Sequence, residues 1–181
     1  MKKVLSFIWE ITKIVIIALV IVVPIRYFLF QPFFVKGQSM EPNFENGDYL
    51  IIDEISFRFR EPQRGEVIVF KYPKNPSQRY IKRIIGLPGE TVEIKDGKVI
   101  IFNEKGNQVL DETGYLSPFL QTSGNIRISL NENKYFVLGD NRLSSSDSRH
   151  WGPLPRADIV GRVYLRAWPF TALAKIAIPT Y

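Results

Sequence analysis

The sequence predicts a mainly β protein, an antiparallel sheet or barrel-like domain preceded by one N-terminal transmembrane helix. Three observations support this fold class. Residues 1–30 are mostly apolar. Beyond them, short apolar or alternating runs are separated by turn-forming residues, and no long amphipathic helical pattern occurs. With 181 residues, the chain has room for one ordinary domain and a short appendage.

The amino-terminal segment is predicted to be a membrane anchor over residues 9–30. Its uncharged centre, residues 14–25, is too short to cross a bilayer by itself. The wider segment supplies the roughly 20 residues that a span needs, provided that Lys13 and Arg26 reach toward opposite headgroup layers.

A cleaved signal peptide also begins with basic residues and an apolar core. Here the core is followed by large residues instead of a small-x-small cleavage site, which favours a retained anchor. Basic residues before the span outnumber the one after it. We therefore expect residues 1–8 in the cytoplasm and residues 31–181 as a β domain on the outer face of the membrane.

The β domain is predicted from seven strand-like runs with turn formers between them. Lys95 to Lys98, between two alternating runs, predicts a hairpin. The polar, weakly periodic stretch 104–125 is expected to leave the main sheet as a less regular excursion. The runs begin at Tyr49, Glu66, Arg79, Thr91, Lys98, Tyr135 and Ile159.

Composition excludes several classes of function. The net charge is +6, but lysine and arginine are scattered among acidic residues, which favours anionic lipid headgroups over nucleic acid as the partner. Cysteine is absent and His150 is the single histidine. Disulfides, thiol catalysis and cysteine- or histidine-rich metal sites are thereby excluded. We expect no metal and no cofactor.

Three segments carry side chains that suit catalysis, although each has an ordinary structural explanation. The serine of Gly37 to Pro42 lies in a loop where most serines form turns. A lysine lies inside the strand-like run from Tyr80 to Gly89, where it could simply protect a sheet edge. The polar segment from Gly139 to Arg149 could be a solvated turn or, despite its two arginines, a crude calcium loop.

Together with Arg64 to Phe70, these segments occur in the order and spacing of the motifs of type I signal peptidases, which the whole chain resembles. The lysine matches the bacterial type, since other branches of the family have histidine there. The resemblance implies a membrane-bound serine endopeptidase of the bacterial cytoplasmic membrane. Such an enzyme removes signal peptides from secreted preproteins after small-x-small motifs.

The resemblance also assigns roles residue by residue. Ser39 matches the nucleophile and Lys82 its general base. Ser145 matches a serine that orients the lysine, and Asp147 with Arg149 matches a supporting acid–base pair. His150 falls outside the position of the histidine in other branches and is expected to be structural.

A serine and lysine pair is also reasonable on chemical grounds. A serine hydroxyl needs a base within hydrogen-bond reach, and this chain has no cysteine and a single histidine. The pKa of Lys82 would have to fall by a few units through burial among apolar neighbours. The Ser39 N–H is the expected oxyanion donor, and Gly37 stands where some relatives have a serine hydroxyl as a second donor.

By the same resemblance, shallow pockets for the small residues before the cut are lined by Phe33, Val35, Phe44 and Ile81. Ordinary core packing explains each of these residues equally well. The apolar C-terminal stretch, from Ala167 to Ile178, is broken by a proline and a lysine and is too short to span. It is predicted to be part of the core or a contact with the membrane surface.

Other functions remain as alternatives. The chain could be a non-catalytic, membrane-tethered binder of exported peptides, or a peptidase dedicated to pilins or conjugation. A self-cleaving repressor relative would share the dyad, but the expected anchor and the lack of a DNA-binding helical unit argue against it. Substrate preference beyond small-x-small and the oligomeric state do not follow from the sequence.

Overall fold

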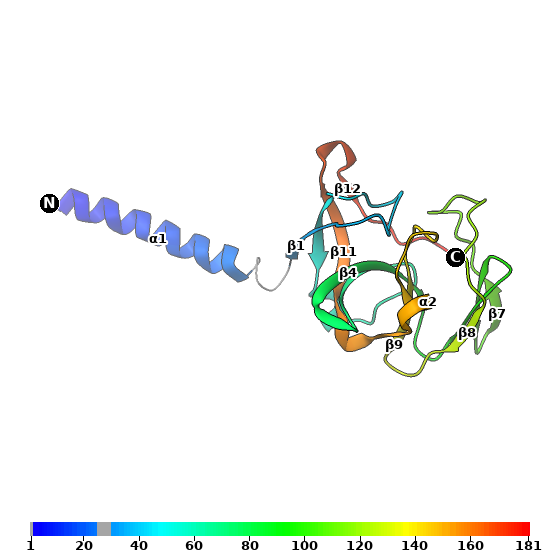
Figure 1. The fold of residues 1–181 in the computed structure, drawn as a ribbon. Helices are drawn as coiled ribbons and strands as arrows, with labels where there is room; N and C mark the ends of the chain where they lie inside the picture. The colour runs from blue at the N-terminus through cyan, green and yellow to red at the C-terminus, as the bar shows by residue number, and fades with distance from the viewer. Residues whose placement is uncertain (1, 25–29) are drawn as a thin grey trace.

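The computed structural model describes residues 2–24 and 30–181 and confirms a mainly β, antiparallel architecture. Figure 1 shows helix α1 standing apart from two β-sheets. The larger sheet has eight strands in the order β1-β2-β11-β3-β4-β9-β10, with β12 paired to β11. The smaller sheet has four strands in the order β7-β6-β5-β8. Every strand pair is antiparallel.

The helices are α1 (Lys2–Pro24) and α2 (Ser148–Trp151), with 3-10 turns η2 (Ser56–Arg58), η3 (Arg156–Asp158) and η4 (Phe170–Ala172). The strands of the larger sheet are β1 (Phe30–Phe34), β2 (Tyr49–Asp53), β3 (Val67–Tyr72), β4 (Asn75–Gly86), β9 (Lys134–Leu138), β10 (Leu154–Pro155), β11 (Ile159–Trp168) and β12 (Ala174–Lys175). The smaller sheet holds β5 (Thr91–Lys95), β6 (Lys98–Asn103), β7 (Gly106–Val109) and β8 (Ile126–Ser129).

All seven predicted runs form strands, and five further strands were missed. The predicted hairpin joins β5 and β6, with Lys95 opposite Lys98 and positive φ at both turn residues, 51° at Asp96 and 76° at Gly97. The missed strands β1, β7, β8, β10 and β12 have two to five residues each, and all but β8, in which Ile126 and Ile128 alternate with polar residues, show little apolar alternation. Pairing with longer neighbours defines them, which a local sequence pattern does not reveal.

Three buried apolar clusters hold the β part together. One fills the space among β1, β2, β3 and β11 and includes Met40 and Phe44 from the loop after β1. The second lies between the two sheets and includes Val92 and Phe136. The third packs Ile68 and neighbours from β3, β4 and β9 beneath Trp151 of α2. The loop after β1 is thus anchored in the first of these clusters, which we call the main core.

Residues 104–125 contain strand β7, which pairs with β6, and otherwise follow an irregular path. Leu110, Leu116 and Thr122 are buried along that path. Arg142, in the loop that follows β9, donates a hydrogen bond to Glu112 of this segment, with an Nη2 to Oε1 distance of 2.5 Å. The segment is therefore tied to the loop that follows β9.

The expected transmembrane helix over residues 9–30 is not supported by the structure. Helix α1 ends at Pro24, and residues 25–29 of the expected span lie outside the described residues. Within the described part of the chain, no helix is long and apolar enough to cross a membrane. Two charged residues, Glu10 and Lys13, interrupt the apolar side chains of α1.

Gly86, the last residue of β4, packs against side chains of and beside the smaller sheet. A Cβ at this position would approach Val92 Cγ2 to 2.4 Å and Leu130 Cδ1 to 2.8 Å. We expect Gly86→Ala to lower the free energy of unfolding by about 1–3 kcal/mol through overpacking. Thermal unfolding of the full chain in detergent measures the change.

Gly114→Ala is the matched control, because a Cβ there would meet nothing within 4 Å. Equal melting temperatures for the two variants would contradict the close approach at Gly86.

Candidate active site

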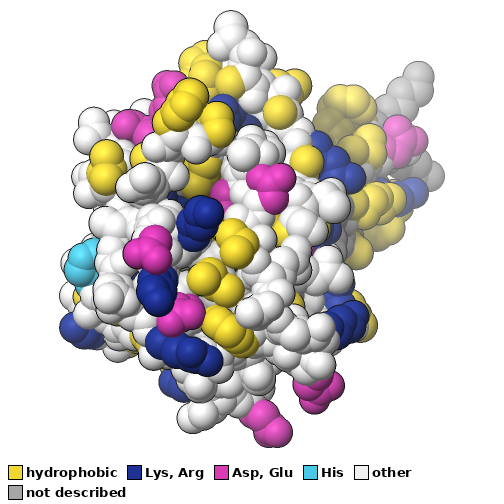
Figure 2. All heavy atoms as spheres, turned by 90° about the vertical axis from the view of Figure 1, so that its right-hand side faces the viewer, with side chains coloured by type: hydrophobic (Ala, Val, Ile, Leu, Met, Phe, Trp, Pro, Cys, Tyr) yellow, Lys and Arg dark blue, Asp and Glu magenta, His cyan; other side chains and the backbone are white. Residues whose placement is uncertain are grey.

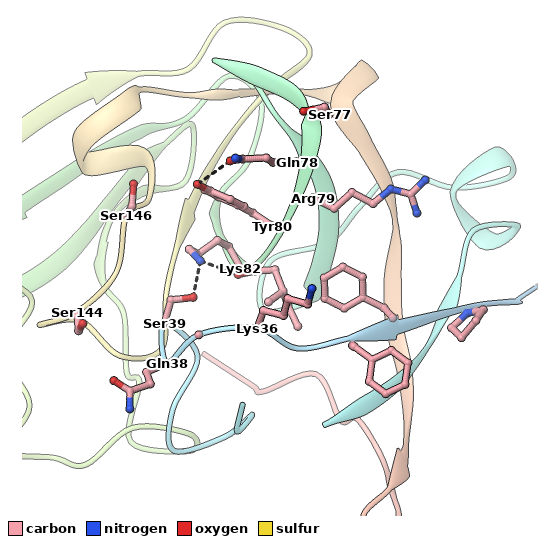
Figure 3. Close-up of a pocket in the computed structure, with 15 residues that line it drawn as sticks. Lys36, Gln38, Ser39, Ser77, Gln78, Arg79, Tyr80, Lys82, Ser144 and Ser146 are labelled. Atoms are coloured by element: carbon pink, nitrogen blue, oxygen red, sulfur yellow. Dashed lines mark hydrogen bonds between the residues drawn. The ribbon is translucent and has the colours of Figure 1, made fainter. Parts of the chain in front are cut away.

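A groove of about 880 Å³ opens between the segment that follows β1 and the first half of β4. Figure 3 shows Ser39 and Lys82 facing each other inside it, with Ser144 and Ser146 on one side. Apolar and polar side chains line the groove in similar measure. Its lining includes Phe33, Phe34, Lys36, Gln38, Gln78, Arg79, Tyr80 and Ile81.

Ser39 lies in a loop that is closed at its base. Val35 N donates to Asp48 O at 2.9 Å, and Gly47 N donates to Val35 O at 2.9 Å. The next residue, Met40, is fully buried in the main core. Because both ends and the middle of the loop are fixed, the Ser39 hydroxyl is held in place at the groove.

Lys82 reaches Ser39 from the central part of β4, where it pairs in register with Ile68 of β3. Its Nζ lies 2.6 Å from Ser39 Oγ and donates a hydrogen bond of 2.8 Å to Ile81 O. A neutral amine at this position can accept the hydroxyl proton of Ser39, and a protonated amine can donate to Oγ. The contact suits a nucleophile and its general base.

Burial lowers the pKa of the Lys82 amine to about 8. The side chain is 3% exposed, and desolvation disfavours the charged form. The negative charges of Asp147 and Asp140 act in the opposite direction and keep the pKa from falling further. The amine is therefore far more easily deprotonated than a lysine in water.

Ser145 lies in the loop after β9, close to Ser39. A Cβ on Gly139 would come within 2.1 Å of Ser145 Oγ and 2.4 Å of Ser39 O, so only glycine fits between them. Ser145 Oγ is buried and has no hydrogen-bond partner among the residues described. The expected contact from Ser145 to Lys82 is thus not formed as a hydrogen bond, although both residues border Ser39.

Asp147 and Arg149 form a bidentate ion pair at the start of α2. Arg149 Nε lies 2.8 Å from Asp147 Oδ1, and Nη2 lies 2.9 Å from Oδ2. Burial raises the pKa of the Asp147 carboxyl, but the Arg149 guanidinium, the Gly139 N–H and the Ser145 hydroxyl together outweigh burial, and the net pKa is below its usual range. Asp147 also accepts from Gly139 N at 3.1 Å, which fixes the glycine beside Ser39.

A second buried ion pair, which the sequence reasoning did not single out, lies behind the dyad. Arg83 donates to Asp140 through Nε at 2.8 Å and through Nη2 at 2.6 Å. Asn43 Nδ2 donates to the same carboxylate at 2.9 Å. Arg83 in an apolar run and Asp140 directly after a strand were visible signals for this pair.

The four residues expected to line substrate pockets separate into two groups. Phe33 and Ile81 line the groove, although Ile81 is only 4% exposed and also belongs to the core cluster beneath it. Val35 and Phe44 are each 2% exposed and belong to the core cluster beneath it. The groove wall additionally includes Phe34, whose side chain is 59% exposed.

The backbone N–H of Ser39 has no acceptor within the described part of the structure, as an oxyanion donor requires. The N–H of Gly37 is already used, because it donates to Asn46 Oδ1 at 2.9 Å. The side chain of His150 is 63% exposed, and its Nδ1 lies 4.0 Å from the Asp147 carboxylate. No group of three potential metal ligands occurs in residues 2–24 and 30–181.

Comparison with known proteins gives concordant matches. The family model described as "Signal peptidase, peptidase S26" matches residues 8–168. A probable signal peptidase I-2 of Synechocystis sp. is 38% identical over 165 residues, covering 88% of this chain and 73% of the relative. Signal peptidase I of Leptolyngbya laminosa is 38% identical, covering 92% of this chain and 83% of the relative. A crystal structure of a signal peptidase I from Enterococcus faecalis, 35% identical, matches 57% of this chain and 97% of that chain with a TM-score of 0.48.

The pKa of Lys82, which burial lowers and the charges of Asp147 and Asp140 raise, can be measured directly. Since the charge of Asp147 raises the pKa of Lys82 against the effect of burial, Asp147→Asn should move that pKa below about 8. NMR titration of the full chain with ¹³Cε-labelled lysine, assigned with Lys82→Arg, follows this amine. Asp111→Asn, at an exposed carboxylate, is the control. An unchanged or higher pKa in Asp147→Asn would contradict the balance.

Proposed function

We propose that this chain, which belongs to the signal peptidase family peptidase S26, cleaves with Ser39 as nucleophile and Lys82 as general base. The chain is a serine peptidase that removes signal peptides from exported preproteins. The observation that carries the proposal is the 2.6 Å contact between Lys82 Nζ and Ser39 Oγ at a buried amine with a lowered pKa.

The proposed reaction begins when neutral Lys82 takes the proton of the Ser39 hydroxyl. Oγ attacks the carbonyl carbon before the cut, and the Ser39 N–H stabilises the oxyanion that forms. The protonated amine then gives its proton to the leaving amine as the C–N bond breaks. Lys82, neutral again, takes a proton from a water that attacks the acyl carbonyl; as the bond to Oγ breaks, Lys82 returns the proton to Ser39, and the signal peptide leaves with a new C-terminal carboxyl group.

The residues around the dyad are proposed to hold it in place. The ion pair of Asp147 with Arg149 fixes the backbone of Gly139, which leaves space for both Ser145 and Ser39. Ser145 Oγ is buried without a hydrogen-bond partner in the described chain, and it is proposed to orient the Lys82 amine from beside Asp147, whose pKa it helps to lower. The ion pair of Arg83 with Asp140 ties strand β4 to the same loop.

The groove is proposed to bind the preprotein in extended form between residues 32–36 and the start of β4. A peptide there would run beside strand edges and could add its own backbone hydrogen bonds. Phe33 and Ile81 would contact the small residues before the cut, while Val35 and Phe44 support the floor.

Replacing either dyad residue tests the proposed chemistry. Ser39→Ala and Lys82→Ala should each lower kcat/KM for a preprotein with a small-x-small site by a factor on the order of 10⁴, because removal of either partner disables the pair. Gel assays with sequencing of the new amino terminus measure the cut. The exposed Ser129→Ala and Lys98→Ala serve as matched controls.

Variants that process the preprotein as fast as the parent would contradict the assignment of the dyad. Cleavage by the parent excludes the alternative in which the chain only binds exported peptides. A parent that binds but never cleaves would favour that alternative.

Membrane attachment through helix α1 is a further part of the proposal. Eight apolar side chains between Ile14 and Val22 are 50–67% exposed, and successive positions place them on all sides of the helix. Figure 2 shows the helix behind the β-sheets, covered largely by apolar side chains. On the face turned to the viewer, Lys and Arg are mixed with Asp and Glu, as suits a partner other than nucleic acid.

This attachment predicts that the full chain stays in the membrane fraction during alkaline carbonate extraction. A double variant, Ile17→Glu with Val20→Glu, should move to the supernatant, because charges in hydrocarbon are costly. Phe119→Glu, at an exposed apolar side chain of the β part, is the control. Extraction of the parent by carbonate would contradict attachment through α1.

A further inference from the structure

Asn141 links the two loops that meet at Ser39. Its backbone N–H donates to Ser39 O at 3.1 Å, and its side-chain Nδ2 donates to Gln38 O at 3.0 Å. Its Oδ1 accepts from Ser144 N at 3.2 Å. The amide orientation is unambiguous because a carbonyl only accepts and a backbone N–H only donates.

The contact to Gln38 O constrains the peptide group that carries the Ser39 N–H. The bond between Gln38 and Ser39 is trans, so the carbonyl and the N–H of this planar group point in opposite directions. Gln38 O also accepts from Glu41 N at 3.2 Å. With the carbonyl held by two donors, the N–H cannot rotate away without breaking both hydrogen bonds.

The orientation matters because the Ser39 N–H has no acceptor of its own in the described structure, while the neighbouring Gly37 N–H is occupied by Asn46. Gly37 also has no side chain that could supply a hydroxyl donor. The stabilisation of the oxyanion therefore depends on how well one peptide group is aimed. A preorganised donor contributes most when it does not have to reorient during the reaction.

We propose that Asn141 is a positioning residue for the oxyanion donor, acting through the carbonyl of Gln38. This role rests on the proposed function, in which Ser39 is the nucleophile. Asn141 does not touch the substrate. It holds the nucleophile loop so that the Ser39 N–H faces the developing negative charge, and its own place is fixed by Ser144 N, at the rim of the groove in Figure 3.

Two substitutions separate the donor of Asn141 from its acceptor. Asn141→Ala removes both, whereas Asn141→Asp removes the Nδ2 donor and keeps an oxygen for Ser144 N. Both should lower kcat by roughly tenfold to a hundredfold, less than the loss of a whole oxyanion donor. Asn103→Ala, on the smaller sheet, is the control, since its Oδ1 also accepts a backbone N–H, from Lys105, far from Ser39.

A pair of inhibitors tests the oxyanion directly in the full chain in detergent. A small-x-small peptide aldehyde accepts Ser39 Oγ at its carbonyl carbon: the C–O bond forms, the π pair becomes the oxyanion, and the hydroxyl proton passes to Lys82. The matching peptide alcohol fills the groove without forming the adduct. The ratio of the two affinities therefore reports on stabilisation of the adduct, and Ser39→Ala should abolish the difference.

The expected result is that both Asn141 variants lose aldehyde affinity by the same factor as kcat, while alcohol affinity changes less than about twofold. Circular dichroism melts show whether the fold is kept, and Asn141→Asp is decisive if Asn141→Ala is unstable. An Asn141→Asp variant with the parent's kcat and aldehyde affinity would overturn the role of Asn141 and leave the proposed function of the chain unaffected. Unimpaired cleavage by Ser39→Ala would instead overturn the proposed function.

Discussion

The burial of one amine determines how the rest of the site is built. Lys82 is 3% exposed, and burial brings its pKa to about 8. The pKa of Lys82 in the folded state lies below its unfolded value of 10.5. Above pH 10.5 the amine is neutral in both states and its burial carries no charge penalty; as the pH falls from 10.5 through about 8, the folded protein loses stability because the buried amine becomes charged. At neutral pH the charged amine costs roughly 3 kcal/mol of folding free energy. The apolar clusters on both faces of β4 offset this cost.

The same constraint explains why three distant segments meet at Lys82. Strand β4 carries the amine, the loop after β1 carries Ser39, and the loop after β9 carries the groups that surround both. Asp140 and Asp147 have two effects. Their charges limit the fall of the Lys82 pKa, and their hydrogen bonds fix the loop after β9. Gly139 allows the closest approach, because a Cβ would displace Ser145 or Ser39.

The sequence predicted the antiparallel fold and the main strands, because those strands have clear apolar patterns and turn residues. It also named Ser39 and Lys82 as a pair, through the resemblance of four ordered motifs to those of type I signal peptidases, and the two lie in contact. The sequence could not reveal which hydrogen bonds connect the loops, such as those of Asn141, since these depend on tertiary placement. Likewise Val35 and Phe44, in the loop that follows β1, proved to be core residues, because the sequence does not tell a groove wall from the packing beneath it.

The most direct test of the account is the pH dependence of kcat/KM for the full chain in detergent, which reports ionisation of the free enzyme. If neutral Lys82 is the general base, the rate should rise with pH through a single ionisation near the pKa of about 8 and level off above it. The NMR titration of the same amine should give the same midpoint. A rate that is independent of pH between about 6 and 10, or a midpoint that differs from that of Lys82, would contradict the central claim.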